Sequence, residues 1–259
     1  MQFKGKTAIV TGSTSGIGLA IAEALAAEGA GIVVNGLGSE ADNAAAIQAI
    51  SKHGTKVTFD PANMMRPGEV AAMVTNAGKA HGAVDILVNN AGIQHVAAVE
   101  DFPIEKWDAV IAINLSSAFH SIRAALPGMK QRNWGRIINI CSAHSLTASP
   151  FKSAYVAAKH GLAGLTKVVA LEVAETRITC NAISPGFVWT PLVEKQIPNL
   201  AKSEGISEAD AKRKVLERQP THRFSEPSEI GALVVYLSSE AAGNVTGTNI
   251  SIDGGWTAL

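Results

Sequence analysis

A glycine-rich turn near the start of the chain joins an apolar run to a helical stretch, and this junction limits the folds open to the chain. The apolar run is Thr7–Val10, the turn is Thr11–Gly18, the helical stretch is Ala20–Ala27, and a second apolar run is Gly31–Val34. The order strand, helix, strand predicts a parallel sheet. Because glycine permits a sharp turn and the following helix presents free N–H groups, the turn is a candidate phosphate site; a plain tight connection is the alternative.

The same alternation of short apolar runs and helical stretches continues along the chain. It predicts a single domain over residues 1–259, with about seven strands in one doubly wound, Rossmann-type parallel α/β sheet. The further strands are expected at Lys56–Phe59, Ile86–Asn89, Gly135–Cys141, Ile178–Ile183 and Thr248–Ile252. The segment of about 186–227 contains prolines and a charged helical stretch, Glu208–Arg218, and is expected to form a lid over the ligand crevice.

Composition and charge exclude several classes of function. The 22 basic and 22 acidic residues cancel, so no net field directs the chain to nucleic acid or to an anionic membrane. No stretch is expected to span a membrane, and glycine and threonine interrupt the first apolar run before it could act as a secretion signal. The two cysteines, Cys141 and Cys180, lie outside any metal-binding spacing, which favours buried thiols, a reducing cytoplasmic setting and no metal.

Three polar residues in the second half of the chain form a pattern that points to catalysis. Tyr155 and Lys159 stand four residues apart in a helical stretch, so their side chains share one face, and Ser142 follows a predicted strand. An ammonium group held beside a phenol favours the phenolate, which can remove a hydroxyl proton as a hydride leaves carbon. Ser142 can bond and orient the substrate oxygen. A core tyrosine with a lysine that extends to solvent is the competing interpretation.

Six motifs that follow one another along the chain resemble those of the short-chain dehydrogenase/reductase family. They are Thr11-Gly-x-x-x-Gly-Ile-Gly18, Asn89-Asn-Ala-Gly92, Asn114, Ser142, Tyr155-x-x-x-Lys159 and Pro185-Gly186. The resemblance implies a nicotinamide dinucleotide cofactor, Tyr155 as general acid and base, Lys159 also on the nicotinamide ribose, and Asn114 as the anchor of a water molecule for proton relay. The residues that it implies for cofactor binding are Gly12, Thr14, Ser15, Gly16, Ile17, Gly18, Leu37, Asn63, Asn90, Ala91, Gly92, Tyr155, Lys159, Pro185, Gly186, Val188, Thr190 and Leu192.

The residues after the second strand bear on the choice between NAD and NADP. Enzymes that use NAD usually have an acidic residue there and enzymes that use NADP a basic one, whereas this chain has Asn35-Gly-Leu-Gly38. Because no basic residue between the turn and Lys52 would neutralise a 2′-phosphate, the sequence favours NAD. Asn63 stands where the family commonly has an aspartate that accepts from the adenine amine, and the carbonyl oxygen of Asn63 can still accept that bond.

A second set of segments resembles, within that family, the enzymes that act on (R)-3-hydroxybutyrate. The segments are Ile93-Gln-His95, Ser142-Ala-His144, Lys152-Ser-Ala-Tyr155, Thr190–Ile197 and Asp253-Gly-Gly-Trp256. The resemblance implies a substrate site of Gln94, His144, Lys152, Gln196 and Trp256, with the first four around the substrate carboxylate. A carboxylate held out of water needs a cation and several donors, which agrees with this set. Solvated loop positions are the competing interpretation of Lys152 and His144, and Ser145, Pro150-Phe151, Phe187 and Trp189 depart from the common pattern.

The predicted activity is the reversible oxidation of (R)-3-hydroxybutyrate to acetoacetate with NAD. The expected partner is a small hydroxy or keto acid, with no nucleic acid and no membrane, and the family resemblance implies a homotetramer. One alternative is a reductase of 3-oxoacyl thioesters with NADPH, which would need basic residues near positions 13–40. Another is a non-catalytic NAD-binding regulator, which would have no need of Asn114, Ser142, Tyr155 and Lys159 together.

Overall fold

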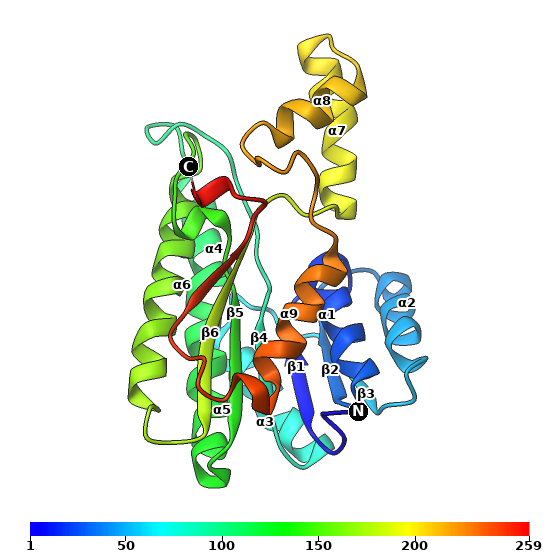
Figure 1. Ribbon diagram of the computed structural model, residues 1–259, viewed down its shortest axis with the longest axis vertical. Coiled ribbons are helices and arrows are strands. Elements are labelled where there is room, and N and C mark those ends of the chain that lie inside the picture. The colour runs from blue at the N-terminus through cyan, green and yellow to red at the C-terminus, as the bar shows by residue number, and fades with distance from the viewer. Residues whose placement is uncertain (259) are drawn as a thin grey trace.

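Seven parallel strands form one sheet in the order β3-β2-β1-β4-β5-β6-β7 in the computed structural model, which describes residues 1–258 apart from the side chain of Leu192 (Figure 1). The strands are β1 (Thr7–Val10), β2 (Gly31–Asn35), β3 (Val57–Asp60), β4 (Ile86–Asn89), β5 (Gly135–Ile140), β6 (Ile178–Pro185) and β7 (Asn249–Ile252). The direction of winding reverses between β1 and β4. In sheets of this kind a crevice opens at the carboxyl ends of the strands at that point.

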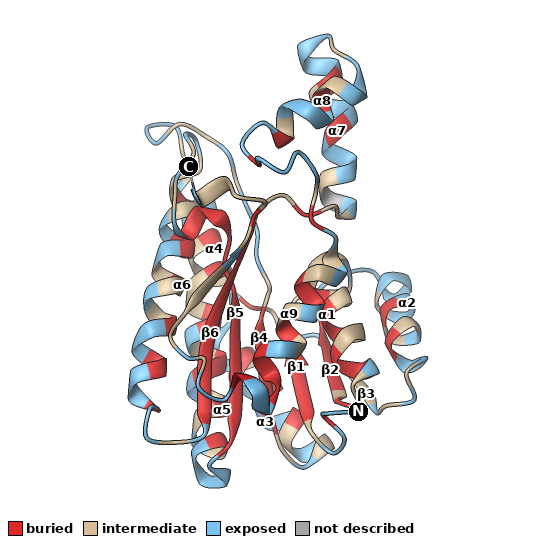
Figure 2. Cartoon of the chain, viewed as in Figure 1, coloured by how far each residue is buried: buried red, intermediate tan, exposed pale blue. Residues whose placement is uncertain are grey.

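Helices cover both faces of the sheet. On one face α1 (Gly16–Ala27) packs against α9 (Pro227–Ser238), with α2 (Glu40–Ser51) beside α1. On the other face lie α3 (Pro67–His81), α5 (Ser117–Arg132) and α6 (Ser153–Glu172). Figure 2 shows that the central strands are buried along their length. Because both faces are covered, β1, β2 and β4 are nearly continuous apolar runs, whereas β5 and β6 also carry buried polar residues such as Arg136 and Asn181.

The prediction of one doubly wound sheet of seven strands is confirmed. Strands β1 and β4 have the predicted bounds, and the ends of the other five differ by one or two residues. Helix α1 begins at Gly16, earlier than the predicted Ala20, because its first turn is built from the glycine-rich segment and carries little apolar periodicity. The end of the glycine-rich turn and the helix start are therefore the same piece of backbone.

One helical stretch, Ile104–Arg132, is long and apolar enough to cross a membrane by length and composition. This finding corrects the expectation that no stretch has that character. The stretch consists of α4 (Ile104–Ile111), a π-helical turn (Ala112–Ser116) and α5, which pack against the sheet, α3 and α6, and 39% of its most apolar window is buried. A helix that packs in a protein core needs the same apolar side chains as a membrane span, so the test does not separate the two.

The segment 186–227 contains two helices, α7 (Pro191–Glu204) and α8 (Glu208–Leu216), which stand away from the sheet beyond its carboxyl edge (Figure 1). The expected helical stretch Glu208–Arg218 corresponds to α8, whereas α7 was not anticipated. Its start is marked by capping rather than by apolar periodicity, because the Thr190 hydroxyl accepts from the N–H of Val193 and Pro191 is the first helical residue. The two helices pack against each other, and the role of this segment as a lid stays a prediction.

Candidate active site

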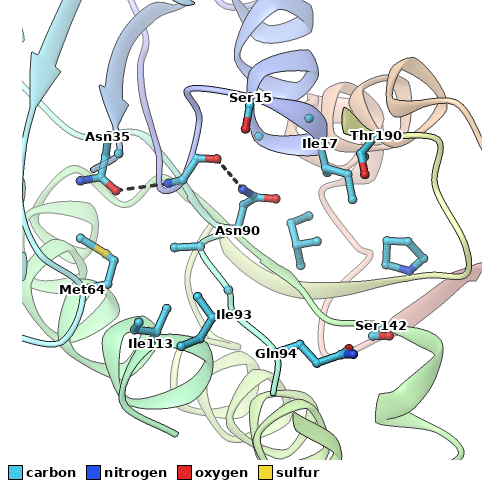
Figure 3. A pocket seen from close by; sticks show the side chains of 18 of the residues that line it. Ser15, Ile17, Asn35, Met64, Asn90, Ile93, Gln94, Ile113, Ser142 and Thr190 are labelled. Atoms are coloured by element: carbon cyan, nitrogen blue, oxygen red, sulfur yellow. Dashed lines mark hydrogen bonds between the residues drawn. The ribbon is translucent and has the colours of Figure 1, made fainter. Parts of the chain in front are cut away.

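A cavity of about 490 Å³ lies at the carboxyl edge of the sheet, where β1 and β4 are neighbours. Its wall combines the turn after β1, the segment after β4, the ends of β5 and β6, and the first residues of α6 and α7. Figure 3 shows Asn35 at one end of this cavity and Gln94 and Ser142 at the other. Parallel strands end at the same edge, so residues far apart in the sequence meet there.

The glycine-rich turn is packed tightly against the segment after β4. A Cβ atom on Gly18 would lie 2.2 Å from the carbonyl oxygen of Gly12, which explains why glycine is required at this position. The Asn90 amide donates to the carbonyl oxygens of Thr11 (2.9 Å) and Gly12 (3.0 Å). Asn35 Oδ1 accepts from the N–H of Gly12 at 3.2 Å (Figure 3). The turn is thus held in shape from two neighbouring strands.

The first turn of α1 leaves backbone N–H groups without side-chain partners. Ser15 precedes the helix in an extended conformation, its side chain makes no capping hydrogen bond, and the first turn contains no acidic residue. The nearby hydroxyl of Ser13 donates back to the Val10 carbonyl oxygen at 2.7 Å. Because Ser15 and Gly16 line the cavity, these donors and the positive end of the helix dipole fit the pyrophosphate of a dinucleotide. This fit favours the phosphate-binding interpretation over a plain tight connection.

Tyr155, Lys159 and Ser142 meet on the wall of the cavity. Tyr155 and Lys159 lie in the first two turns of α6, and Ser142 follows β5. Lys159 is buried, and its Nζ donates to the carbonyl oxygen of Ile140 at 2.8 Å and lies 5.6 Å from the centre of the Tyr155 ring. The side chain of Lys159 therefore does not extend to solvent, in contrast to the competing interpretation. The helix holds a buried positive charge beside the phenol, as the spacing of four residues predicts.

Asn114 lies in the π-helical turn between α4 and α5 and is buried. Its Oδ1 accepts from the N–H of Ile93 at 2.8 Å, and its Nδ2 donates to the Ile93 carbonyl oxygen at 2.7 Å. Single π-helical turns are frequent at functional sites because they redirect one side chain out of the regular helical register. The observed role of the Asn114 side chain is therefore to hold the segment after β4, which carries Gln94. Its role as the anchor of a relay water stays a prediction.

His144 lies behind Ser142 and Tyr155 and is buried. Its ring meets the rings of Tyr155 and Trp256 edge-on, with centres 5.9 and 5.1 Å apart. Its Nε2 lies 2.8 Å from Ser149 Oγ, and its Nδ1 lies 3.4 Å from Ser142 Oγ. Burial, with smaller contributions from the charges of Lys152 and Arg218, lowers the pKa of His144 to about 4. His144 is therefore neutral at pH 7, and both of its ring nitrogens face hydroxyl groups.

Two cations stand beside this neutral histidine. Lys152 precedes α6 and is half-buried, and Arg218 follows α8 with its guanidinium carbon 6.0 Å from the centre of the Trp256 ring. Burial and then the charge of Arg218 lower the pKa of Lys152. Within residues 1–258, no acidic group forms an ion pair with either side chain. Two cations without an acidic ion-pair partner among the described residues therefore surround His144, and this positive pole suits an anionic ligand.

The cavity brings together most of the residues predicted to bind the cofactor. Those that line it are Gly12, Ser15, Gly16, Ile17, Gly18, Leu37, Asn63, Asn90, Ala91, Gly92, Tyr155, Lys159, Pro185, Gly186 and Thr190. Thr14 packs against Gly36 instead, and Val188 is buried in the core. The side chain of Leu192 lies outside the described residues.

The predicted substrate residues divide into three groups. Gln94 lines the cavity with Ser142. His144, Lys152 and Trp256 gather behind the catalytic residues, as described above. Gln196 is exposed on α7 and is not part of the cavity wall. A contact between Gln196 and a substrate would therefore need α7 to move toward the sheet.

Sequence reasoning missed Arg218 and Ser149. The Arg218 guanidinium donates to Ser149 Oγ at 2.7 Å, and this hydroxyl in turn contacts His144. Arg218 lies in a charged stretch in which several basic residues look alike, and the two partners are 69 positions apart. No local pattern distinguishes either residue, because their proximity arises only when the segment after α8 returns to the loop before α6.

The departures from the family pattern find partners in the structure. Phe187 stacks on Trp256, with ring centres 5.1 Å apart and planes 11° apart. Trp189 packs on Phe224. The Ser145 hydroxyl donates to the Ser142 carbonyl oxygen at 2.8 Å and so supports the turn that carries the catalytic serine. Phe187, Trp189 and Ser145 are thus accommodated by local contacts, whereas Phe151 is exposed and has a positive φ of 67°.

The fold and the site together define a class of protein. A doubly wound sheet with an uncapped helix at its switch point binds dinucleotides, and a Tyr–Lys pair with a serine beside the same cavity serves proton transfer coupled to hydride transfer. The class is that of the dinucleotide-dependent oxidoreductases.

Comparison with known proteins places the chain within this class. The family model described as Enoyl-(Acyl carrier protein) reductase matches residues 12–257. The D-beta-hydroxybutyrate dehydrogenase of Cupriavidus necator is 60% identical over 99% of this chain and 100% of its own, and that of Rhizobium meliloti is 55% identical over 98% and 99%. The crystal structure of a variant of actinorhodin polyketide ketoreductase with NADPH superimposes with a TM-score of 0.93 at 33% identity, over 100% of this chain and 99% of that chain. This protein belongs to the short-chain dehydrogenase/reductase family.

Proposed function

We propose that the protein interconverts (R)-3-hydroxybutyrate and acetoacetate with NAD as the hydride carrier. The observation that carries the proposal is the positive pole of Lys152 and Arg218 around His144, whose ring contacts Tyr155, because it supplies a carboxylate site near the groups that handle the oxygen. The names and the high identity of the Cupriavidus necator and Rhizobium meliloti relatives support the same substrate.

In the proposed mechanism, Tyr155 Oη accepts the proton of the 3-hydroxyl group and Ser142 holds the same oxygen by a hydrogen bond. NAD bound in the cavity supplies the acceptor for the hydride that leaves C3. Lys159 holds the ribose beside Tyr155, and Lys152 holds the carboxylate. The carboxylate and the 3-oxygen are anchored at two separate points and the nicotinamide would supply a third, so the C3 hydrogen of only one enantiomer, proposed to be the (R)-alcohol, would face the hydride acceptor.

We propose NAD rather than NADP because the adenosine end of the cavity supplies no cation. Among the described residues of the wall, Lys159 is the one charged residue, and it lies beside Tyr155 at the other end. Leu37 is exposed at the adenosine end, and Gly36 packs closely on Thr14. A 2′-phosphate would therefore lose water without gaining a partner. The neighbouring ketoreductase structure with NADPH indicates that the fold itself accommodates either cofactor.

Asn63 lines the same end of the cavity. Its Oδ1 accepts from the N–H of Met65 at 2.9 Å, and its own N–H donates to Glu69 at 2.8 Å. The carbonyl oxygen has a second lone pair, so it can still accept from an adenine amine as well. We therefore retain Asn63 as the proposed adenine contact.

The test is a steady-state assay of 2-, 3- and 4-hydroxy acids with NAD and with NADP, followed by the absorbance of the reduced nicotinamide. We expect (R)-3-hydroxybutyrate with NAD to exceed the other combinations in kcat/KM by at least about tenfold. Reduction of 3-oxoacyl thioesters with NADPH as the preferred reaction would favour the alternative reductase. Cofactor binding without turnover of any substrate would favour the non-catalytic regulator.

We also propose a homotetramer in a reducing, cytoplasmic setting. Exposed apolar side chains on α5 and α6 support an assembly surface, namely Phe119, Val168 and Leu171, which are 47%, 52% and 77% exposed. Cys141 and Cys180 are buried free thiols, as predicted, and burial raises the pKa of Cys141 to about 11. Light scattering should give four times the mass of the chain, and a monomer in dilute solution would contradict the assembly.

A further inference from the structure

A continuous line of polar groups connects the end of α8 to the catalytic serine. The Arg218 guanidinium donates to Ser149 Oγ at 2.7 Å, and Ser149 Oγ lies 2.8 Å from His144 Nε2. His144 Nδ1 lies 3.4 Å from Ser142 Oγ, which also accepts from the backbone N–H of His144 at 3.2 Å. The line begins in the segment that carries α7 and α8 and ends at the hydroxyl group beside Tyr155.

Arg218, the first residue of this line, determines which group donates and which accepts in each hydrogen bond. Arg218 can only donate, so Ser149 Oγ accepts there and keeps its own hydrogen for a second partner. When Ser149 donates that hydrogen to Nε2 of His144, the imidazole proton resides on Nδ1 and points to Ser142 Oγ. Ser142 then accepts from the ring and from the backbone, and its hydroxyl hydrogen stays free for a substrate oxygen. In the opposite tautomer, Nδ1 is an acceptor that competes for this hydrogen.

The surroundings of His144 support a single neutral tautomer. The charged and titratable groups that face the ring are Lys152, Arg218, His160 and Tyr155. Burial is the largest cause of the lowered pKa of His144, and the two cations act in the same direction, so the ring carries one proton at neutral pH. A neutral ring has one donor and one acceptor nitrogen, which is the state that the line requires.

We propose that Arg218 is a positioning residue that acts through Ser149 and His144 to keep the hydroxyl hydrogen of Ser142 directed at the substrate oxygen. The inference rests on the proposed hydride transfer to or from an alcohol oxygen held by Ser142, but not on the identity of the acid. It also couples the two halves of the site. Arg218 follows α8 (Figure 1), so a motion of α7 and α8 that carries Arg218 away from Ser149 would break the line and release the Ser142 hydrogen from its productive direction.

The test compares Arg218→Gln and Ser149→Ala on 3-hydroxybutyrate and on an uncharged secondary alcohol. We expect each variant to lower kcat by about tenfold on both substrates, less than the 10²- to 10³-fold that loss of an oxyanion donor itself costs. The double variant should be no slower than either single variant, because both cut the same line. The Kd for NADH should change less than about twofold, and Arg218→Lys, which keeps a cationic donor, should recover most of the loss.

Three results would overturn the proposal. A loss confined to the acid would show that Arg218 reads the carboxylate directly. Additive losses in the double variant would show two independent effects, and an unchanged Nδ1–H tautomer in the ¹⁵N spectrum of Ser149→Ala would show that Ser149 does not set the ring proton. Arg213→Gln, which alters an exposed arginine of α8 that pairs with Asp210, is the matched control and should retain full activity. The uncharged alcohol distinguishes a failure of this proposal from a failure of the substrate assignment. If 3-hydroxybutyrate is not the substrate, the variants can still be compared on the alcohol.

Discussion

Replacing Lys152 with methionine tests the carboxylate site most directly. The substitution removes the charge and keeps an unbranched apolar side chain of similar length, so the half-buried position before α6 stays filled. Because burial and Arg218 lower the pKa of Lys152, its charge is unfavourable in the free folded protein. The variant should therefore be at least as stable to denaturant as the wild type, while it loses its use of the acid.

The size of the loss follows from the surroundings of Lys152. A hydrogen bond between a cation and a carboxylate contributes about 1.5–3 kcal/mol. Arg218 remains in the variant and continues to supply positive charge, so the lower part of that range applies. At about 1.4 kcal/mol per factor of ten, a loss of about 1.5–2 kcal/mol is roughly a 10- to 30-fold fall in kcat/KM. For an uncharged alcohol that lacks the carboxylate, the kcat/KM of the variant should fall by less than about twofold, which is the effect expected for the loss of an exposed charge.

Steady-state kinetics on the acid and on the uncharged alcohol decides the matter. Lys167→Met, at an exposed position of the same helix, is the matched control and should leave both substrates unaffected. An equal loss on both substrates would mean that Lys152 supports the fold of the site rather than the carboxylate. In that case the proposed substrate loses its main structural support, although the assignment of Tyr155 would stand.

Four further outcomes are expected. Tyr155→Phe should reduce kcat to below about 1% while the Kd for NADH changes only a few-fold, since the ring still fills its place but the proton acceptor is gone. In thermal unfolding with and without NAD, Gly18→Ala should lose about 1–3 kcal/mol of stability and most of the stabilisation by NAD, because its Cβ would lie 2.2 Å from the Gly12 carbonyl oxygen. Hydrogen exchange in residues 186–227 should slow when cofactor and substrate bind, and equal protection in both states would identify fixed scaffold. The pKa of His144 is about 4 in the folded protein against 6.5 in the unfolded chain, so the unfolded chain takes up the proton first as the pH falls. The free energy of unfolding should therefore drop between about pH 6.5 and 4. In denaturant titrations, His144→Gln should remove about 1–2 kcal/mol of that drop.

The sheet was predictable because burial on both faces makes β1, β2 and β4 nearly continuous apolar runs, and β5 and β6 keep several apolar residues despite buried polar ones. Strands β1 and β4 were found at their predicted bounds, whereas α1 begins at Gly16, inside the glycine-rich turn, rather than at the predicted Ala20. Helix α7 was missed because Pro191 and Pro198 interrupt the segment, although Val193, Ile197, Leu200 and Ala201 recur at helical spacing and the last three pack toward α8. The stretch Ile104–Arg132 is long and apolar enough to cross a membrane, although the sequence was expected to contain no such stretch. The hydropathy of a core helix can equal that of a membrane span.

The site was predictable where function places residues at fixed spacing along one element. Tyr155 and Lys159 share a helix face, so their proximity follows from four residues of separation. His144 was anticipated as a carboxylate contact, but its burial and the hydroxyl groups on both ring nitrogens could not be read from its neighbours in the sequence. Arg218 contacts Ser149 because the chain after α8 folds back toward the loop before α6. No local sequence pattern predicts this contact.

The positive pole has a consequence for the free protein that joins stability to substrate binding. Burial and the charge of Arg218 lower the pKa of Lys152, and the neutral state of His144 avoids a further positive charge in the same volume. The free site is therefore less stable than a neutral one would be, and a carboxylate that enters it relieves this repulsion while it forms charge-assisted hydrogen bonds. Differential stabilisation of this kind favours the anion over an isosteric neutral molecule without any steric exclusion. Because Arg218 also reaches the line of groups that ends at Ser142, we propose that the charge that attracts the acid also helps to hold the Ser142 hydroxyl in position.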